Sequence, residues 1–184
     1  ELRQLVMRQG RPFLSAPSSG RPPLEWYHRL LHVPSSGDEV IVGEMQWQGN
    51  DLVSVTPIWL NVVTGRSGRV AIDVPPGTVA WLFDAGGEAR VAVARREGRR
   101  LVHWRGPGAG SWRLLDDSPL MRVPFEPRFV DDRGGLYVLR PSGAGGTSEL
   151  VRWDFAAGRP EPKSFVATPG FDFSGALITD GDGG

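Results

Sequence analysis

The 184-residue chain contains no cysteine, and this absence removes several kinds of chemistry. Disulfide bonds, thiolate nucleophiles and cysteine-ligated metal sites all require that residue. The cellular compartment stays open, because reducing and oxidising environments both tolerate proteins without cysteine. Net charge is absent as well, since 21 basic residues balance 21 acidic ones. Nucleic-acid-binding domains usually carry a strong basic excess, so we expect no nucleic-acid partner.

Long hydrophobic runs are also missing. No apolar run approaches the ~20 residues that a membrane-spanning helix needs, so we expect no membrane partner. The 25 glycines and 16 prolines are spread along the chain and interrupt helical patterns. Lysine occurs once, at Lys163, and the other basic residues are arginine, which indicates a GC-rich, bacterial coding sequence. Hydrophobic residues still make up 40% of the chain, which is enough for a packed core.

What the chain does contain is a repeated pattern of turns and short β-rich segments. A glycine-containing turn followed by strand-forming residues occurs three times, at residues 36–46, 85–95 and 132–141. Runs of β-branched and aromatic residues bounded by turn residues are typical of strands and hairpins. Four such strands repeated about every 45–50 residues are the signature of a β-propeller blade.

The sequence therefore predicts an all-β fold, a partial β-propeller of four-stranded antiparallel blades. We expect a single partial propeller domain whose complete blades lie at residues 28–74, 78–117 and 125–168. We expect residues 1–16 to be the terminal hairpin of a preceding blade. Residues 171–184 are expected to begin the next blade, with a strand from Phe171 to Ile178.

The segment Pro22–Val33 has two interpretations. An amphipathic helix would place Leu24, Tyr27, Leu30 and Leu31 on one face, with proline at its start. A loop followed by a strand at residues 28–33 would instead complete the first repeat. The repeat favours the strand.

Tryptophans recur in the third strand of each predicted unit, as Trp59, Trp104 and Trp153. A Gly-Arg pair follows that strand in the first and third units, at Gly65-Arg66 and Gly158-Arg159, whereas the second unit has a longer glycine loop. We expect the tryptophans to pack between sheets.

Several of these segments resemble the propeller of the prolyl oligopeptidase-like serine peptidases, which are bacterial α/β-hydrolases. The resemblance rests on "LNVVTGR", "VDDRGGLYVLR", "ELVRWDFAAGRPE", "PGFDFSGALI" and "RRLVHWRGPGAGSWRLL", and it spans about residues 39–178. Other propeller families share such loose blade motifs. The resemblance implies a non-catalytic propeller that gates the access of short peptides to a hydrolase domain outside this sequence.

The nucleophile motif of that family, G-x-S-x-G, is absent. "GRSGR" at Gly65–Arg69 has the wrong spacing, and "DFSGA" at Asp172–Ala176 lacks the first glycine. We therefore expect no catalytic residue, no cofactor and no metal site in this chain. The implied partners are a C-terminal α/β-hydrolase domain of the same parent chain and a peptide substrate, with self-association through open blade ends.

Two other functions are open. A stand-alone propeller would bind a protein or glycan partner. An enzyme acting at the propeller axis would need polar groups on the first strands of the blades. These strands read "RLLHV", "VAWLF" and "PRFVD", which are mostly apolar, so the axial enzyme ranks last.

A few residues carry candidate chemistry. His28 and His32 have a spacing that could bind metal on a helix, and Asp180 and Asp182 have the spacing of a partial calcium loop. We interpret these residues, and His103 in a third strand, as structural. The charge run Arg95–Arg100 is predicted to be a solvated hairpin tip.

Two pairs of adjacent carboxylates fall at predicted strand ends, at Asp116-Asp117 and Asp131-Asp132. Neighbouring residues of a strand point to opposite faces of its sheet. Neither pair is therefore expected to perform acid/base chemistry.

Overall fold

The computed structural model describes residues 5–7, 23–142, 146–168 and 170–173. Across these ranges the secondary structure consists of twelve β-strands without a helix. The described part of the chain accordingly has no helix that could cross a membrane. The prediction of an all-β fold is confirmed, and the strand interpretation of residues 28–33 is correct, because β1 runs from His28 to His32.

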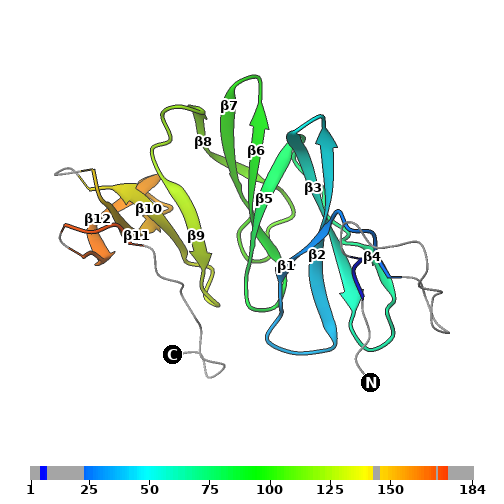
Figure 1. The fold of residues 1–184 in the computed structure, drawn as a ribbon. Helices are drawn as coiled ribbons and strands as arrows, with labels where there is room; N and C mark the ends of the chain where they lie inside the picture. The colour runs from blue at the N-terminus through cyan, green and yellow to red at the C-terminus, as the bar shows by residue number, and fades with distance from the viewer. Residues whose placement is uncertain (1–4, 8–22, 143–145, 169, 174–184) are drawn as a thin grey trace.

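The strands form three four-stranded antiparallel sheets, each made of consecutive strands (Figure 1). The first sheet contains β1 (His28–His32), β2 (Glu39–Gln48), β3 (Asp51–Asn61) and β4 (Ser67–Arg69). The second contains β5 (Thr78–Phe83), β6 (Ala89–Arg96), β7 (Arg99–Trp104) and β8 (Arg113–Pro119). The third contains β9 (Glu126–Val130), β10 (Leu136–Pro141), β11 (Ser148–Asp154) and β12 (Arg159–Val166).

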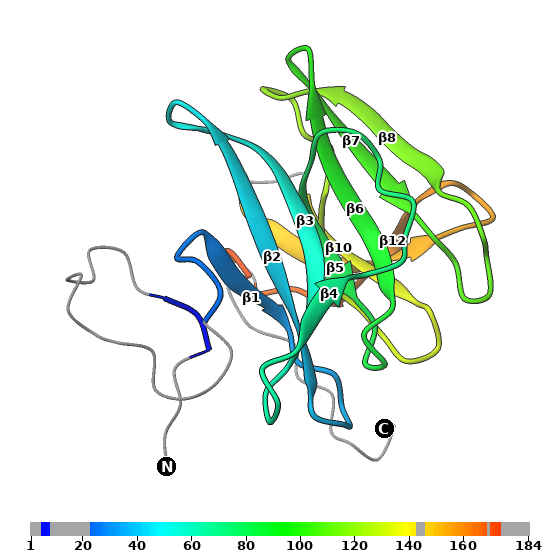
Figure 2. The ribbon, with the colours of Figure 1, turned by 90° about the vertical axis from the view of Figure 1, so that its right-hand side faces the viewer.

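The sheets stand side by side in chain order (Figure 1), and Figure 2 shows the first sheet in front of the second. The opening strand of the second sheet, β5, lies against β3 and, less extensively, β1 of the first sheet, and against β9 of the third. The first strands of all three sheets therefore meet on one side of the molecule. None of the three sheets closes on itself.

A glycine in the left-handed conformation precedes the second strand of every sheet. These are Gly37, Gly87 and Gly134, with φ angles of 90°, 84° and 76°. Each lies two residues before its strand, at a position where a side chain would strain the backbone. The repeated turn in the sequence is thus the hairpin between the first and second strands of each sheet.

Carboxylates support two of these hairpins. Asp84 accepts a hydrogen bond from the backbone N–H of Glu88 at 2.9 Å. Asp131 accepts one from the backbone N–H of Gly135, in the same place of the third sheet. The corresponding residue of the first sheet is Pro34, so that hairpin lacks this support.

The turns after β3 and β11 are equally alike. Asn61 Oδ1 accepts from the N–H of Thr64, and Asp154 Oδ1 accepts from the N–H of Ala157. Each turn ends in a left-handed glycine, Gly65 or Gly158. The shared Gly-Arg motif therefore marks a turn in which an Asn or Asp side chain replaces backbone partners.

The predicted fourth strand of the first sheet is shorter than expected, because β4 ends at Arg69 and residues 70–74 are not in a strand. Opposite Val70 lies Pro57 of β3, which accepts a bond from the Val70 N–H at 3.2 Å but has no N–H to return. Pairing stops there. Val70, Ile72 and Val74 instead pack against the core between the first and second sheets.

The predicted elements at the two ends fall mostly outside the described residues. For the N-terminal hairpin of residues 1–16, only residues 5–7 are described, and there Val6 forms an isolated parallel bridge with Leu24. For the strand at 171–178, only residues 171–173 are described, and they are not in a strand.

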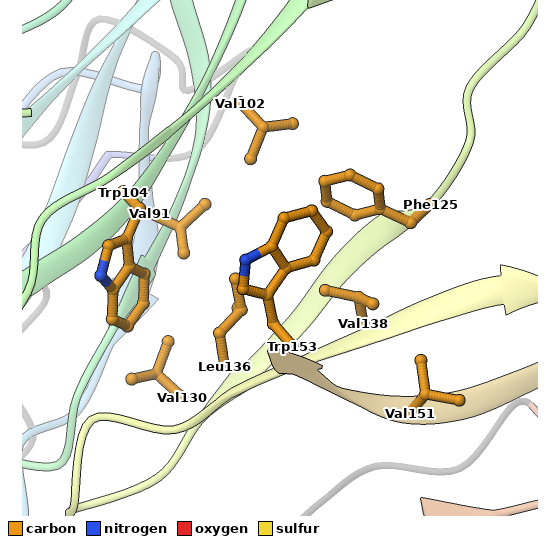
Figure 3. Packing of buried hydrophobic residues seen from close by; sticks show 9 residues of the cluster. All are labelled: Val91, Val102, Trp104, Phe125, Val130, Leu136, Val138, Val151 and Trp153. Carbon is orange, nitrogen blue, oxygen red and sulfur yellow. The ribbon is translucent and has the colours of Figure 1, made fainter. Parts of the chain in front are cut away.

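The largest core cluster lies between the second and third sheets (Figure 3). Trp104 enters it from β7 and packs against Phe155, with ring centroids 4.7 Å apart. Trp153 enters from β11 and packs against Phe125 at 4.5 Å. Trp104 and Trp153 do pack between sheets, whereas Trp59 is only partly buried against the core between the first and second sheets. Trp104 faces the next sheet and Trp153 the preceding one, so their positions are not equivalent.

Hydrogen bonds tie the first sheet to the second. The indole N–H of Trp81 donates to the backbone oxygen of Val55 at 2.7 Å. The N–H of Ser35 donates to the backbone oxygen of Ala85 at 2.9 Å. Both bonds fix the orientation of β5 relative to the first sheet, and so position the cavities described below.

Candidate functional site

A cavity of about 360 Å³ lies where the first strands β1, β5 and β9 meet. We call it the inner cavity. Its walls are mostly apolar, with a few polar side chains at the edge. It is lined by Leu31, His32, Trp81, Leu82, Phe83, Ala85, Arg128, Phe129, Val130 and Asp132.

His32 is half-buried, whereas Arg128 and Asp132, the other polar side chains that line this cavity, are exposed. Its ring stacks on Phe83, with centroids 5.5 Å apart, and its buried Nε2 atom has no hydrogen-bond partner among the described residues. Burial lowers the pKa of His32, although the Asp84 charge and backbone contacts with Ala85 and Asp84 oppose this. The imidazole is thus mainly neutral at pH 7 and has hydrogen-bonding capacity to spare.

A second cavity, of about 400 Å³, lies between the second and third sheets, near the turn from β6 to β7. We call it the tip cavity. It shares Trp81 and Leu82 with the inner cavity, so the two follow β5 from one end to the other. It is lined by Val79, Ala80, Trp81, Leu82, Val93, Arg95, Arg100, Leu120, Val123, Glu126 and Pro127.

Arg100 is the most deeply buried charged residue of the tip cavity, at 7% exposure. Its Nη1 atom lies 3.8 Å from Asp116 Oδ2, beyond hydrogen-bond reach, and has no hydrogen-bond partner among the described residues. Its Cζ lies 5.9 Å from the centre of the Phe125 ring. Burial lowers the pKa of Arg100, and the charges of Asp116 and Glu126 raise it. A guanidinium remains charged in proteins, so the cavity holds a desolvated cation.

The prediction of a solvated tip at Arg95–Arg100 holds for its first residues and is wrong for its last. Arg95, Arg96 and Arg99 are exposed, and the turn passes through Glu97 and Gly98. Arg100 is buried because it shares a sheet face with Val102 and Trp104, which pack against the third sheet. Strand alternation from Trp104 back to residue 100 is the sequence signal that could have revealed this.

Of the adjacent carboxylates, Asp116 and Asp117 do separate as predicted. Asp117 Oδ1 pairs with the exposed Arg99 Nε at 2.5 Å, whereas Asp116 faces Arg100. The Asp131 carboxylate accepts hydrogen bonds from the N–H groups of Arg133 and Gly135 in its own turn and from the Tyr137 hydroxyl at 3.3 Å. Asp132 follows Asp131 in the turn after β9, outside the strand, so strand alternation separates only Asp116 from Asp117.

The histidines are not gathered into a metal site. His28 and His32 lie on β1, and His103 on β7. His103 Nδ1 has no hydrogen-bond partner among the described residues, and burial lowers the pKa of its ring. Over the described ranges, no three His, Asp or Glu side chains are close enough to hold a metal ion. Asp180 and Asp182 lie outside those ranges.

No serine, threonine or lysine is among the residues that line either cavity. Ser67 lies on the short edge strand β4, which is followed by irregular chain and no helix. Ser174 is outside the described residues. The geometry of the two cavities suits the holding of a ligand, with apolar walls and a few unsatisfied polar groups.

Comparison with protein-family models, with curated proteins and with solved structures gave no match to this chain.

Proposed function

We propose that the three sheets are consecutive blades of a β-propeller that belongs to a prolyl oligopeptidase-like serine peptidase. In this proposal the propeller is non-catalytic. It admits or holds short peptides for a hydrolase domain encoded outside these 184 residues.

The observation that carries the propeller is the meeting of β1, β5 and β9. Each sheet is a meander with its first strand at one edge and its fourth strand at the other. The first strands β1 and β9 both contact β5, which also packs against β3. Blades arranged around an axis have this geometry, with first strands innermost. Stacked sheets of a sandwich would instead face each other along their whole width.

The two cavities favour peptide holding. They follow β5 on the side where the blades converge, and both combine apolar walls with isolated polar groups. Such surfaces suit ligands that carry apolar side chains and amide or charged groups. No serine lines either cavity, which is consistent with serine-dependent cleavage taking place elsewhere.

The test uses the natural polypeptide that contains this sequence, isolated from its source with antibodies raised against the 184 residues. A fluorophosphonate probe, which labels activated serines, should react with it. Peptide mapping should then locate the label on a serine outside the present sequence. The matched control is the 184-residue chain produced alone, which should not react.

Two results would overturn the peptidase proposal. A polypeptide that the probe does not label would favour a stand-alone binding propeller. Label on Ser67 or Ser174 would place the nucleophile within this chain, contrary to its lack of a nucleophile elbow.

A further inference from the structure

The tip cavity is lined by a buried cation, Arg100, that lacks a direct hydrogen bond to the carboxylate nearest to it. Arg99 and Arg100 are neighbours on β7, and each faces an aspartate of β8. The exposed pair closes to a direct hydrogen bond of 2.5 Å between Arg99 Nε and Asp117 Oδ1. The buried pair stays open, at 3.8 Å between Arg100 Nη1 and Asp116 Oδ2. A charged hydrogen bond stabilises a buried ion pair more than an exposed one, yet Arg100 and Asp116 lack this bond whereas Arg99 and Asp117 form it.

The carboxylate facing Arg100 is occupied by another donor. Asp116 Oδ2 accepts a hydrogen bond from Ser118 Oγ at 2.8 Å. Arg95, opposite Arg100 in the β6–β7 ladder, adds a second positive charge at the rim of the cavity. Glu126 stands on the wall formed by the third sheet. Arg100 Nη1 is buried without a hydrogen-bond partner, and the guanidinium forms no hydrogen bond with the described residues although Arg100 lines the cavity. A buried cation without such bonds is costly unless a ligand supplies an acceptor.

The remaining walls are apolar and partly open to solvent. Val79 and Leu82 come from β5, and Val93 from β6. Leu120 and Val123, in the connection from β8 to β9, are 40% and 37% exposed. A ligand entering here would cover these side chains and present an acceptor to the guanidinium at the same time.

We propose that the tip cavity binds a carboxylate that carries a short branched apolar group, with Arg100 as the donor and the valines and leucines as walls. A carboxylate matches the planar donors of a guanidinium, and the cavity volume is in the range of small-ligand sites. The proposal does not rest on the peptidase assignment, because the second and third sheets and the connection between them supply every wall.

Two chemical sources of such a carboxylate are distinguished by the probes. Isovalerate represents a free short-chain acid. N-acetyl-alanyl-leucine represents the C-terminus of a peptide and carries the same isobutyl group. Each is measured by calorimetric titration against its neutral amide, isovaleramide or N-acetyl-alanyl-leucinamide. At least one acid should bind about tenfold to a hundredfold more tightly than its amide, as expected for a charged hydrogen bond. The acid that binds more tightly than its amide by this factor identifies the ligand as a free short-chain acid or as a peptide C-terminus.

Two substitutions on the same strand sharpen the test. Arg100→Gln should weaken binding of the preferred acid by about tenfold or more, and should leave its amide unaffected. Arg99→Gln removes an equal charge from the exposed face and should leave binding of the acid within about twofold. The proposal is wrong if neither isovalerate nor N-acetyl-alanyl-leucine binds more tightly than its amide. This comparison needs only the unaltered protein. Equal affinity of the two variants for the acid would overturn the proposal as well.

Discussion

Trp81 and Trp153 are two buried tryptophans that differ in whether the indole N–H is hydrogen-bonded. Both rings are buried, at 8% and 4% exposure, and both lie between sheets. The indole N–H of Trp81 donates to Val55 across the first interface, whereas the Trp153 N–H has no hydrogen-bond partner among the described residues. Replacement of either residue by phenylalanine removes the same atoms.

The two substitutions should therefore differ in cost. Each removes the same volume of side chain from the interior, although Trp81 borders the inner and tip cavities and Trp153 borders neither. Trp81→Phe also leaves the oxygen of fully buried Val55 without its indole donor, which costs about 1–3 kcal/mol. Trp153→Phe removes a buried donor that had no acceptor, so part of its cavity cost is offset. We expect Trp81→Phe to be the more destabilising by at least about 1 kcal/mol.

Equilibrium unfolding in urea, followed by far-ultraviolet circular dichroism, measures the difference. The slope of the unfolding free energy against urea should be equal in the two variants, so that their midpoints can be compared directly. Trp153→Ala serves as the reference for removal of the whole side chain, and its free energy of unfolding should be lower by about 3–5 kcal/mol. Equal losses for the two phenylalanine variants, or a larger loss for Trp153→Phe, would refute the hydrogen-bond argument.

Three further expectations follow from the packing. Gly43→Ala should destabilise the chain by about 1–3 kcal/mol in urea unfolding, because its Cβ would lie 2.6 Å from a methyl of Val55. Burial lowers the pKa of His103 below 6.5, so the unfolded chain takes up a proton first as pH falls. The free energy of unfolding should then decrease as pH falls below about 6.5, with His103 contributing at most about 1.4 kcal/mol per pH unit. This contribution should stop changing once the pH is below the pKa of His103 in the folded chain. His103→Asn should flatten that decline, and an unchanged pH profile would contradict the assignment. The open face of the third sheet carries Phe165, 60% exposed, against Tyr137. Light scattering should detect concentration-dependent association that Phe165→Ser reduces, and a monomer at all concentrations would count against it.

The sequence was sufficient for the elements whose geometry is decided locally. Gly87 and Gly134 need left-handed backbone, and Asp154 caps its own turn, so the hairpins could be placed from residue type and spacing alone. The end of β4 required knowledge of a partner strand. Pro57 limits the pairing of Val70, and the two residues become opposite only once the register of β3 and β4 is known.

Little of the candidate site could be predicted from the sequence. Arg100 belongs to a highly charged run, and its burial depends on which face of β7 meets the third sheet. Trp81 and Glu126 line one cavity although they are far apart in the chain. The prediction that first strands are mostly apolar describes the walls correctly, but the polar groups that matter there come in part from β7 and from strand ends.

The convergence of the first strands is the central structural claim, and spin-label distances test it most directly. The chain has no cysteine, so pairs of engineered cysteines can be labelled without background. One pair replaces the exposed residues Leu30 of β1 and Arg128 of β9, on the side where the sheets converge. The other replaces the exposed residues Arg69 of β4 and Lys163 of β12, at the opposite edges.

Double electron–electron resonance should give a clearly shorter distance for the pair at residues 30 and 128 than for the pair at residues 69 and 163. Blades that radiate from an axis must separate toward their fourth strands, so the propeller proposal predicts this order. Similar distances for the two pairs would indicate sheets stacked face to face along their whole width. That result, or a shorter distance for the pair at residues 69 and 163, would contradict the propeller arrangement.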